Sequence, residues 1–223
     1  MERVSYPVKE RQVLPEILDS LAPDDPRARR SRRDLGFINA IMGNYRWLSG
    51  KMRAADTDGS FQWIETGSGD GPLARFHDRF PGTVTGLDFA PRPRDWPETW
   101  QWIEGDLFAT LPTALTPEGN AGLVANLFLH HFDDAMLAAL GKILNERISR
   151  LYFVEPAREK VFRVLGYALF PFINEVTRHD MQVSIGAGFQ RGELASTLGL
   201  DGSWRVRETV TPLGAYRFEA WKK

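Results

Sequence analysis

The chain has 223 residues, of which 28 are Lys or Arg and 29 are Asp or Glu, so that the formal net charge is −1. Its length suits one domain with a sizeable core, and its 43% hydrophobic and 26% charged residues exclude a disordered chain. The near-neutral charge argues against a dedicated nucleic-acid binder, and the absence of cysteine excludes disulfides, iron–sulfur clusters and thiolate zinc sites.

The N-terminal quarter is expected to be helical. Helical spacing of apolar residues predicts helices over 8–21 and 26–50, and Gly50 with the stretch 56–59 predicts a linker. We therefore expect residues 1–55 to form a helical cover or substrate lid and residues 56–223 to form the main domain. The second helix is predicted from apolar residues that recur at helical spacing, namely Leu35, Ile38, Ile41 and Met42.

Charge is distributed unevenly along the chain. Residues 26–53 contain eight basic residues and one acidic residue, whereas residues 54–140 contain 13 acidic and four basic residues. The basic segment is either a solvated helix face or a surface for an anionic substrate or an acidic carrier protein. The sequence leaves both interpretations open.

From residue 61 onward, apolar strand-like segments alternate with helical ones. This alternation predicts a parallel sheet with helices on both faces, followed by an antiparallel pair at the C-terminal end. The expected strands are 61–66, 83–87, 100–103, 122–128, 151–154, 204–211 and 215–221. The expected helices are 71–80, 133–147 and 157–175, the last bent or ended by Pro171.

A glycine-rich loop follows the first expected strand. It reads Glu65-Thr66-Gly67-Ser68-Gly69-Asp70-Gly71 and runs into a helix that opens with Pro72. Glycines allow positive φ and a close approach of ligand to backbone, and ligands of open α/β sheets bind at the carboxyl ends of the strands. A tight turn without a ligand is the alternative. A phosphate-binding P-loop is excluded because no Gly-Lys-Ser/Thr occurs.

Two acidic residues lie at the ends of the next two strands. Asp88 is placed where a carboxylate chelates the two hydroxyls of a ribose, and Asp106 where one accepts a hydrogen bond from an adenine amino group. Each alone is a plausible solvated loop residue, but together with the glycine loop they face one crevice. Residues 69–74 also fit the pattern G-x-G-x-x-A, so an NAD(P)-dependent dehydrogenase remains a weaker alternative, although Tyr-x-x-x-Lys is absent.

These elements, together with Asn126-Leu127-Phe128-Leu129-His130-His131-Phe132-Asp133-Asp134, resemble class I S-adenosylmethionine-dependent methyltransferases. The likeness covers roughly residues 35–221 and is to small-molecule enzymes of the ubiquinone/menaquinone-methyltransferase-like group. It implies a seven-stranded sheet of order 3-2-1-4-5-7-6 with strand 7 antiparallel. The cofactor site that it implies comprises Glu65, Gly67, Gly69, Gly71, Asp88, Phe89, Asp106, Leu107, Asn126 and Leu127.

Two departures from that family stand out. The family has a full helix between the second and third strands, where this chain has three prolines within 89–97, so we expect no helix there. The fourth strand begins with Ala121-Gly122, where the family often places an aspartate.

Three histidines are candidate catalytic bases. His130 and His131 follow the fourth strand at the reactive end of the implied cofactor, and His179 is a further candidate. Helix capping or packing is the alternative for the pair, and pairing with Asp180 in a loop is the alternative for His179. Adjacent residues on one turn rarely converge on one ion, so we expect no metal at His130, His131, Asp133 and Asp134.

The substrate is expected to be small and lipophilic or phenolic. The segment 161–173 is apolar nearly all round, and Tyr45, Trp47 and Phe170 are candidate substrate-binding residues. The expected reaction is O- or C-methylation with S-adenosyl-L-methionine. The alternative is a catalytically silent cofactor-binding module that binds a protein or RNA through its basic helix.

The N-terminal residues and the hydropathy pattern indicate where in the cell the protein is located. Residues 1–9 are charged and include Pro7, unlike a signal peptide, and no window holds the roughly 20 apolar residues that span a bilayer. We therefore expect a soluble cytoplasmic protein.

Overall fold

The computed structural model describes residues 10–115 and 120–223. Residues 1–9, which include the start of the expected helix 8–21 and the segment judged unlike a signal peptide, lie outside the described residues. No helix in the described ranges is both long enough and apolar enough to cross a membrane.

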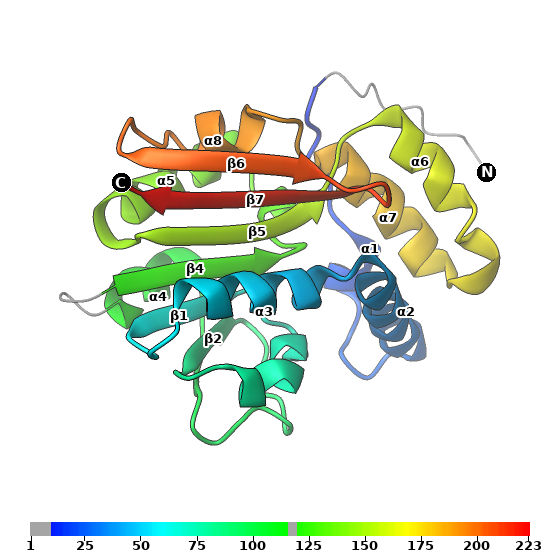
Figure 1. Cartoon of the computed structure of the whole chain (residues 1–223). Helices are drawn as coiled ribbons and strands as arrows, with labels where there is room; N and C mark the ends of the chain where they lie inside the picture. Colours follow the sequence, from blue (N-terminus) through cyan, green and yellow to red (C-terminus); the bar gives the residue numbers. More distant parts are fainter. Residues whose placement is uncertain (1–9, 116–119) are drawn as a thin grey trace.

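A seven-stranded sheet lies at the centre of the described part (Figure 1). Its order is β3-β2-β1-β4-β5-β7-β6, with β1 to β5 parallel and β7 antiparallel to both of its neighbours, which confirms the expected topology. The strands are β1 (Phe61–Thr66), β2 (Val84–Asp88), β3 (Gln101–Glu104), β4 (Asn120–Asn126), β5 (Arg150–Pro156), β6 (Trp204–Val210) and β7 (Ala215–Lys222).

Helices cover both faces of this sheet and also its carboxyl end. They are α1 (Ile17–Ser20), α2 (Pro26–Met42), α3 (Asn44–Ala55), α4 (Leu107–Ala114), α5 (Asp134–Arg147), α6 (Lys160–Tyr167), α7 (Glu175–Ala187) and α8 (Glu193–Thr197), with 3-10 helices η1 (Pro72–Arg79), η2 (Leu129–His131) and η3 (Phe170–Phe172). In Figure 1, α1, α2, α6 and α7 gather beyond the arrowheads of β4 and β5. The carboxyl ends of the parallel strands are therefore covered by the N-terminal segment and by residues 160–187.

Two hydrophobic clusters fill the space between sheet and helices. Apolar residues of α4, α5 and α8 pack with Ile64, Leu123 and Phe153 on one face. Apolar residues of α3 and η1 pack with Trp63 and Val124 on the other. Neighbouring residues of the buried parallel strands thus point into different clusters, which is why these strands read as continuous apolar runs.

The N-terminal helices differ from those expected. The predicted helix over 26–50 is two helices, because Gly43 adopts φ 65° and separates α2 from α3. Gly50 lies within α3 and breaks nothing, since packing on the sheet outweighs the roughly 1 kcal/mol cost of one helical glycine. Within the described residues 10–21 of the predicted helix 8–21, only α1 is helical, because Pro15 precedes it and the amides of Ile17 and Leu18 donate to the Asp180 carboxylate.

Other helices also depart from expectation. The segment 71–80 forms the 3-10 helix η1 instead of an α-helix. The expected helix 157–175 is divided into α6, which already ends at Tyr167, and the short η3, which contains Pro171, before α7 begins at Glu175. Helices α4, α7 and α8 were not predicted. The expectation that 89–97 is not helical is confirmed, and Trp96 within it is buried against η1 and β3.

Candidate functional site

The glycine loop lies where β1 ends and η1 begins. Gly67, Gly69 and Gly71 all have positive φ, at 66°, 51° and 68°. A Cβ on Gly67 would stand 2.3 Å from the ring of Phe128, so this glycine is required by a close approach as well as by its conformation. A Cβ on Gly69 would meet no atom within 4 Å, so that side of the loop faces open space.

Glu65 is a buried acid without a partner. It belongs to β1, its side chain is 1% exposed, and neither carboxylate oxygen accepts a hydrogen bond from any described residue. Burial, followed by the negative charge of Asp88, raises its pKa well above 4.5 and outweighs the nearby Ser68 side chain, which lowers it but donates its hydroxyl to the Glu65 backbone carbonyl. A buried carboxylate of this kind is costly to the folded protein unless a cation or a strong donor reaches it.

Asp88 organises the loop from the end of β2. Its Oδ2 accepts a hydrogen bond from the amide of Gly69 at 2.8 Å, and its Oδ1 accepts one from the amide of Ala90 at 2.8 Å. Each oxygen keeps further acceptor capacity, so the carboxylate is positioned and still able to bind two hydroxyls. Phe89 beside it is 72% exposed, which leaves an aromatic ring free at the same strand end.

Asp106 and Leu107 lie at the start of α4. Asp106 is its N-cap, and Oδ1 accepts hydrogen bonds from the amides of Phe108 and Ala109 at 2.9 and 3.0 Å. The side chain of Leu107 is 3% exposed and belongs to the core. A cofactor at this strand end would therefore meet Asp106 and the backbone of Leu107, while the leucine side chain faces inward.

Asn126 and Leu127 end β4 beside the glycine loop. The Asn126 amide Nδ2 donates to Asn39 Oδ1 at 3.0 Å, and the Asn44 amide donates to the same oxygen at 2.8 Å. The Asn126 Oδ1 is buried and has no hydrogen-bond partner among the described residues. Leu127 adopts φ 53°, a left-handed conformation that is costly for leucine and that clusters at functional sites.

The three candidate substrate-binding residues lie in different places. Tyr45 is half-buried beside Glu65 and Asn126, and burial, followed by the charge of Glu65, raises its pKa well above 10. Trp47 packs edge-on against Tyr152 of β5 at 6.3 Å between ring centroids. The ring of Phe170, in η3, contacts Tyr167. The structure thus brings only Tyr45 to the predicted cofactor residues.

A buried glutamate holds the turn that follows β4. Glu155 is fully buried at the end of β5, and its Oε1 accepts hydrogen bonds from the amides of Phe128 and Leu129 at 3.1 and 2.8 Å. Its Oε2 lies 2.7 Å from Nδ1 of His130, whose Nε2 lies 3.4 Å from Glu16 Oε1. Burial lowers the pKa of His130, but the bonds to Glu155 and Glu16 outweigh it and raise the pKa to about 9.

His131 differs sharply from its neighbour. Burial, followed by the positive charge of His130, lowers its pKa to about 4, so that its imidazole is neutral at neutral pH. His179 lies in α7, not in a loop, and its Nδ1 is 2.9 Å from Asp180 Oδ1. Of the adjacent pair, only His131 has an unprotonated ring at neutral pH, and its low pKa makes it a weak base.

The sequence placed Asp133 and Asp134 beside His130 and His131, but in the structure other acidic residues contact these histidines. Asp133 caps α5 and Asp134 pairs with Arg11, whereas Glu16 joins His130 and His131 in a group whose ligand atoms lie within 4.8 Å of one another. Both nitrogens of His130 already contact carboxylates, which favours a charged hydrogen-bonded cluster at this place.

An N-terminal strap, residues 11–19, closes over this turn, and sequence reasoning missed it. The Arg11 guanidinium donates to the carbonyls of His130, Phe132 and Ala187. Glu155 was also missed, although an acidic residue in the run Val154-Glu155-Pro156 at the end of an apolar strand was a signal for it. The role of the strap had no local signal, because its partners lie more than 100 residues away in sequence.

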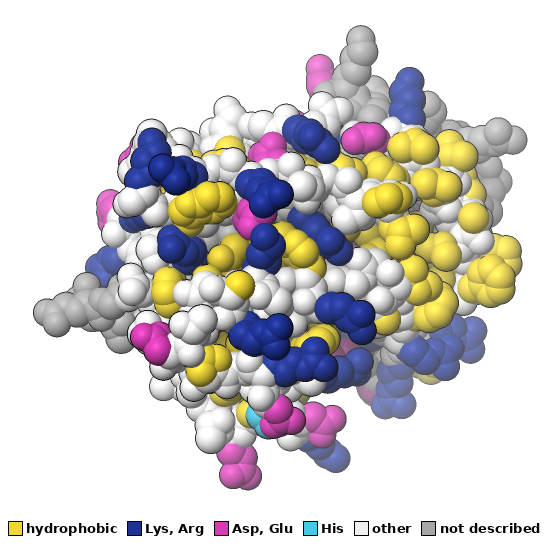
Figure 2. Space-filling model, viewed as in Figure 1, with side chains coloured by type: hydrophobic (Ala, Val, Ile, Leu, Met, Phe, Trp, Pro, Cys, Tyr) yellow, Lys and Arg dark blue, Asp and Glu magenta, His cyan; other side chains and the backbone are white. Residues whose placement is uncertain are grey.

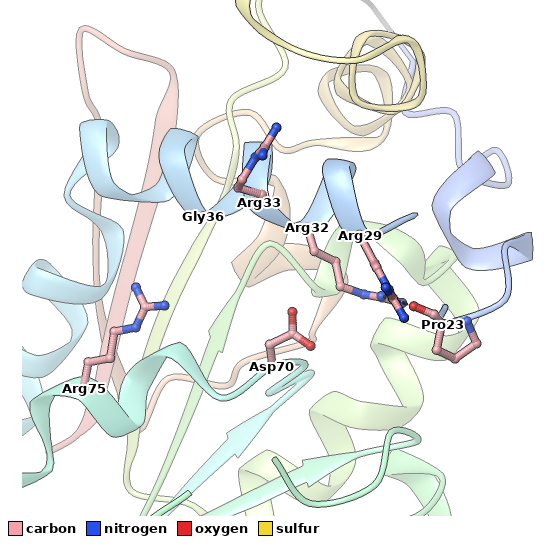
Figure 3. A pocket seen from close by; sticks show the side chains of 7 residues that line it. All are labelled: Pro23, Arg29, Arg32, Arg33, Gly36, Asp70 and Arg75. Carbon is pink, nitrogen blue, oxygen red and sulfur yellow. Dashed lines mark hydrogen bonds between the residues drawn. The ribbon is translucent and has the colours of Figure 1, made fainter. Parts of the chain in front are cut away.

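A cavity of about 610 Å³ opens between α2 and the glycine loop. Figure 3 shows the Asp70 carboxylate in this space, with Arg75 on one side and Arg29 and Arg32 on the other. Pro23, Arg33 and Gly36 complete its lining. The described part of α2 therefore forms one wall of an entrance to the site.

The fold of this chain is that of class I methyltransferases. No family model matches the chain, and no curated protein does. Solved structures do match over nearly the whole chain, at sequence identities low enough that the similarity establishes the fold alone.

Among these structures are two plantazolicin methyltransferases. BamL, in complex with a triazolic desmethylPZN analog and SAH, has a TM-score of 0.68 at 9% identity and covers 92% of each chain. BpumL with SAH has a TM-score of 0.62 at 10% identity and covers 90% of this chain and 91% of its own. The pyocyanin biosynthetic protein PhzM has a TM-score of 0.59 at 17% identity, and the match covers 93% of this chain but 62% of PhzM.

Proposed function

We propose that this protein is an S-adenosylmethionine-dependent methyltransferase that acts on a small, lipophilic or phenolic molecule at oxygen or carbon. The single observation that carries the proposal is Glu65, a buried acid with two unpartnered oxygens beside the glycine loop of a methyltransferase fold. Structures that share the fold are recorded with SAH, the demethylated form of this cofactor, which supports the same choice.

The residues at the strand ends fit the cofactor. Glu65 would receive the ammonium group of its methionine part, which supplies the cation that the buried carboxylate lacks. Asp88 would accept hydrogen bonds from the ribose hydroxyls, and Asp106 from the adenine amino group. The unpartnered oxygen of Asn126 and the strained Leu127 would lie by the sulfonium. When bound, the cofactor supplies the electrophilic methyl group.

The protein itself would position the acceptor and take its proton. Methyl transfer is an in-line displacement, so most of the rate comes from placing the nucleophile correctly. His131 is the preferred base, because it is neutral while His130 is charged and occupied by Glu155 and Glu16. Glu155 is a positioning residue, since it holds both His130 and the backbone of the turn.

The class of acceptor is inferred from the residues around the entrance. Tyr45 lies at the site, and α6 and α7, which flank η3 with its Phe170, lie at the carboxyl end of β4 and β5 (Figure 1). Membership of the ubiquinone/menaquinone-like group remains a prediction, as do the boundary at residue 55 and an acidic carrier protein as partner. The plantazolicin and pyocyanin enzymes indicate that this fold serves diverse small-molecule or peptide chemistry.

The alternative is a silent cofactor-binding module that uses its basic helix to bind a protein or RNA. The observation in its favour is that the guanidinium groups of Arg29, Arg30 and Arg33 form no ion pair or hydrogen bond with any described residue. It predicts binding of SAH without turnover on any phenol or quinol, and a complex that weakens steeply with salt.

Calorimetric titration with SAH, with NAD and NADP measured in parallel, tests the cofactor assignment. We expect binding of SAH alone and its loss in Asp88→Ala. Unchanged affinity in that variant would remove the ribose role of Asp88, and binding of NAD instead of SAH would overturn the proposal. Methylation of a phenol or quinol panel then separates the enzyme from the silent module.

A further inference from the structure

Helix α6 carries an apolar stripe that faces outward. Val161, Val164 and Leu165 recur at helical spacing and are 51%, 66% and 48% exposed. Tyr167 and Phe172, which follow, are 54% and 75% exposed. Figure 2 shows apolar side chains gathered on the side of the molecule where α6 lies in Figure 1. Contiguous exposed apolar surface of this kind marks an interaction site.

The face of α6 opposite the stripe packs against the rest of the protein, so the stripe faces outward. Gly166 is buried and lies close to Met181 of α7, and Phe162 packs under the turn at Gly214, so the opposite face of α6 already has its core contacts. The five exposed residues therefore form a second apolar face that the fold itself does not bury.

Arginine side chains border this apolar face. A second cavity of about 640 Å³ is lined by Phe172 together with Arg27, Arg30, Arg33 and Arg178. Two acids, Asp34 and Glu175, also line it, but Asp34 is buried and accepts hydrogen bonds from Asn174 and Thr177. Arg30 and Arg33 have no ion-pair partner among the described residues. Figure 2 shows basic side chains directly below the apolar ones.

We propose that the α6 stripe and these arginines form a docking surface for an anionic lipid bilayer. The stripe would enter the boundary between headgroups and acyl chains, while the arginine cavity receives lipid phosphate groups. An apolar helix face next to basic residues is the pattern of proteins that lie on a membrane. A second copy of this chain fits less well, because an isologous contact would bring two arginine clusters together.

This proposal goes beyond the methyltransferase function, since it concerns where the protein works. The carboxyl ends of β4 and β5, which lead to the turn at His130 and His131, face the group of helices that includes α6 (Figure 1). Docking through α6 would therefore hold that turn close to the bilayer, from which a lipophilic acceptor could enter.

Vesicle sedimentation of the full chain tests the proposal. We expect binding to vesicles that contain phosphatidylglycerol and little binding to pure phosphatidylcholine, with the difference lost at high salt. Val164→Glu should weaken binding about tenfold. Val206→Glu on β6, at another exposed valine, is the matched control. Arg30→Gln should weaken binding about fivefold, with Arg205→Gln as its control.

Three outcomes of the vesicle experiment would overturn the proposal. These are absence of binding to either vesicle, equal binding to both, and equal losses in the Val164 and Val206 variants. A dimer in light scattering that Val164→Glu dissociates would assign the stripe to a second copy instead. Circular dichroism of each variant shows that the fold is intact without relying on SAH binding, which keeps this test separate from that of the proposed function.

Discussion

Replacing Glu65 by glutamine should make the ligand-free protein more stable and its cofactor binding weaker. The substitution keeps the shape of a side chain that is 1% exposed and removes only its ability to ionise. Opposite changes in stability and affinity are expected because the carboxylate accepts no hydrogen bond from any residue that the structure describes and is proposed to gain a partner from the cofactor. A purely structural residue would show no such reversal.

The stability change follows from proton linkage. The pKa of Glu65 in the folded chain is raised well above 4.5, mainly by burial, so folding takes up a proton at this group. Above that reference pKa the free energy of unfolding therefore falls by up to about 1.4 kcal/mol for each pH unit, until the pH passes the folded-state pKa. Glutamine does not titrate. The variant should lack this slope and be the more stable protein at neutral pH.

The affinity change follows from the lost charge. A hydrogen bond between charged groups contributes about 1.5–3 kcal/mol, so Glu65→Gln should weaken SAH binding roughly 10- to 100-fold. Urea unfolding across a pH series gives the stability, and calorimetric titration gives the affinity. Glu104→Gln, at an exposed glutamate of β3, is the matched control and should change neither quantity. Lower stability of the Glu65 variant at neutral pH, or wild-type SAH affinity, would refute the reasoning.

Three further predictions concern the loop and the turn. Gly67→Ala should lower the free energy of unfolding in urea by about 2–4 kcal/mol, because the new Cβ meets Phe128. Gly199→Ala is the control, since Gly199 has φ 61° and open space around it, and should lower the free energy by only about 1–2 kcal/mol. Equal losses in the two variants would contradict the contact with Phe128. His130, whose pKa rises from 6.5 to about 9, gives stability that is present below pH 6.5 and lost as the pH rises through about 9. His130→Gln should remove that alkaline loss, of about 3 kcal/mol at most, and an unchanged pH profile would exclude the charged form. His131→Ala should lower kcat far more than SAH affinity, and unchanged turnover of an identified acceptor would exclude it as the base.

The general architecture could be predicted because its signals are local. Alternation of apolar strands with helices and the turn glycines depend on neighbouring residues, so β1 was predicted at its exact bounds and β7 within one residue. The strand order came from the resemblance carried by four short motifs, and the structure confirms it. The predicted helix boundaries were wrong where tertiary packing outweighed local preference. Gly50, for example, was expected to break a helix but lies within α3.

The sequence alone determined that this chain is an α/β protein with a glycine loop and two acids at neighbouring strand ends, since φ preference and periodicity are properties of short segments. Tertiary structure was needed to show that Glu155 holds the turn at His130, and that Glu16 of the N-terminal strap approaches the same ring. It also showed that, within the described ranges, the carboxylate of Glu65 has no hydrogen-bond partner and one apolar face of α6 is exposed. These properties depend on contacts between residues far apart in sequence and on burial, which no local pattern encodes.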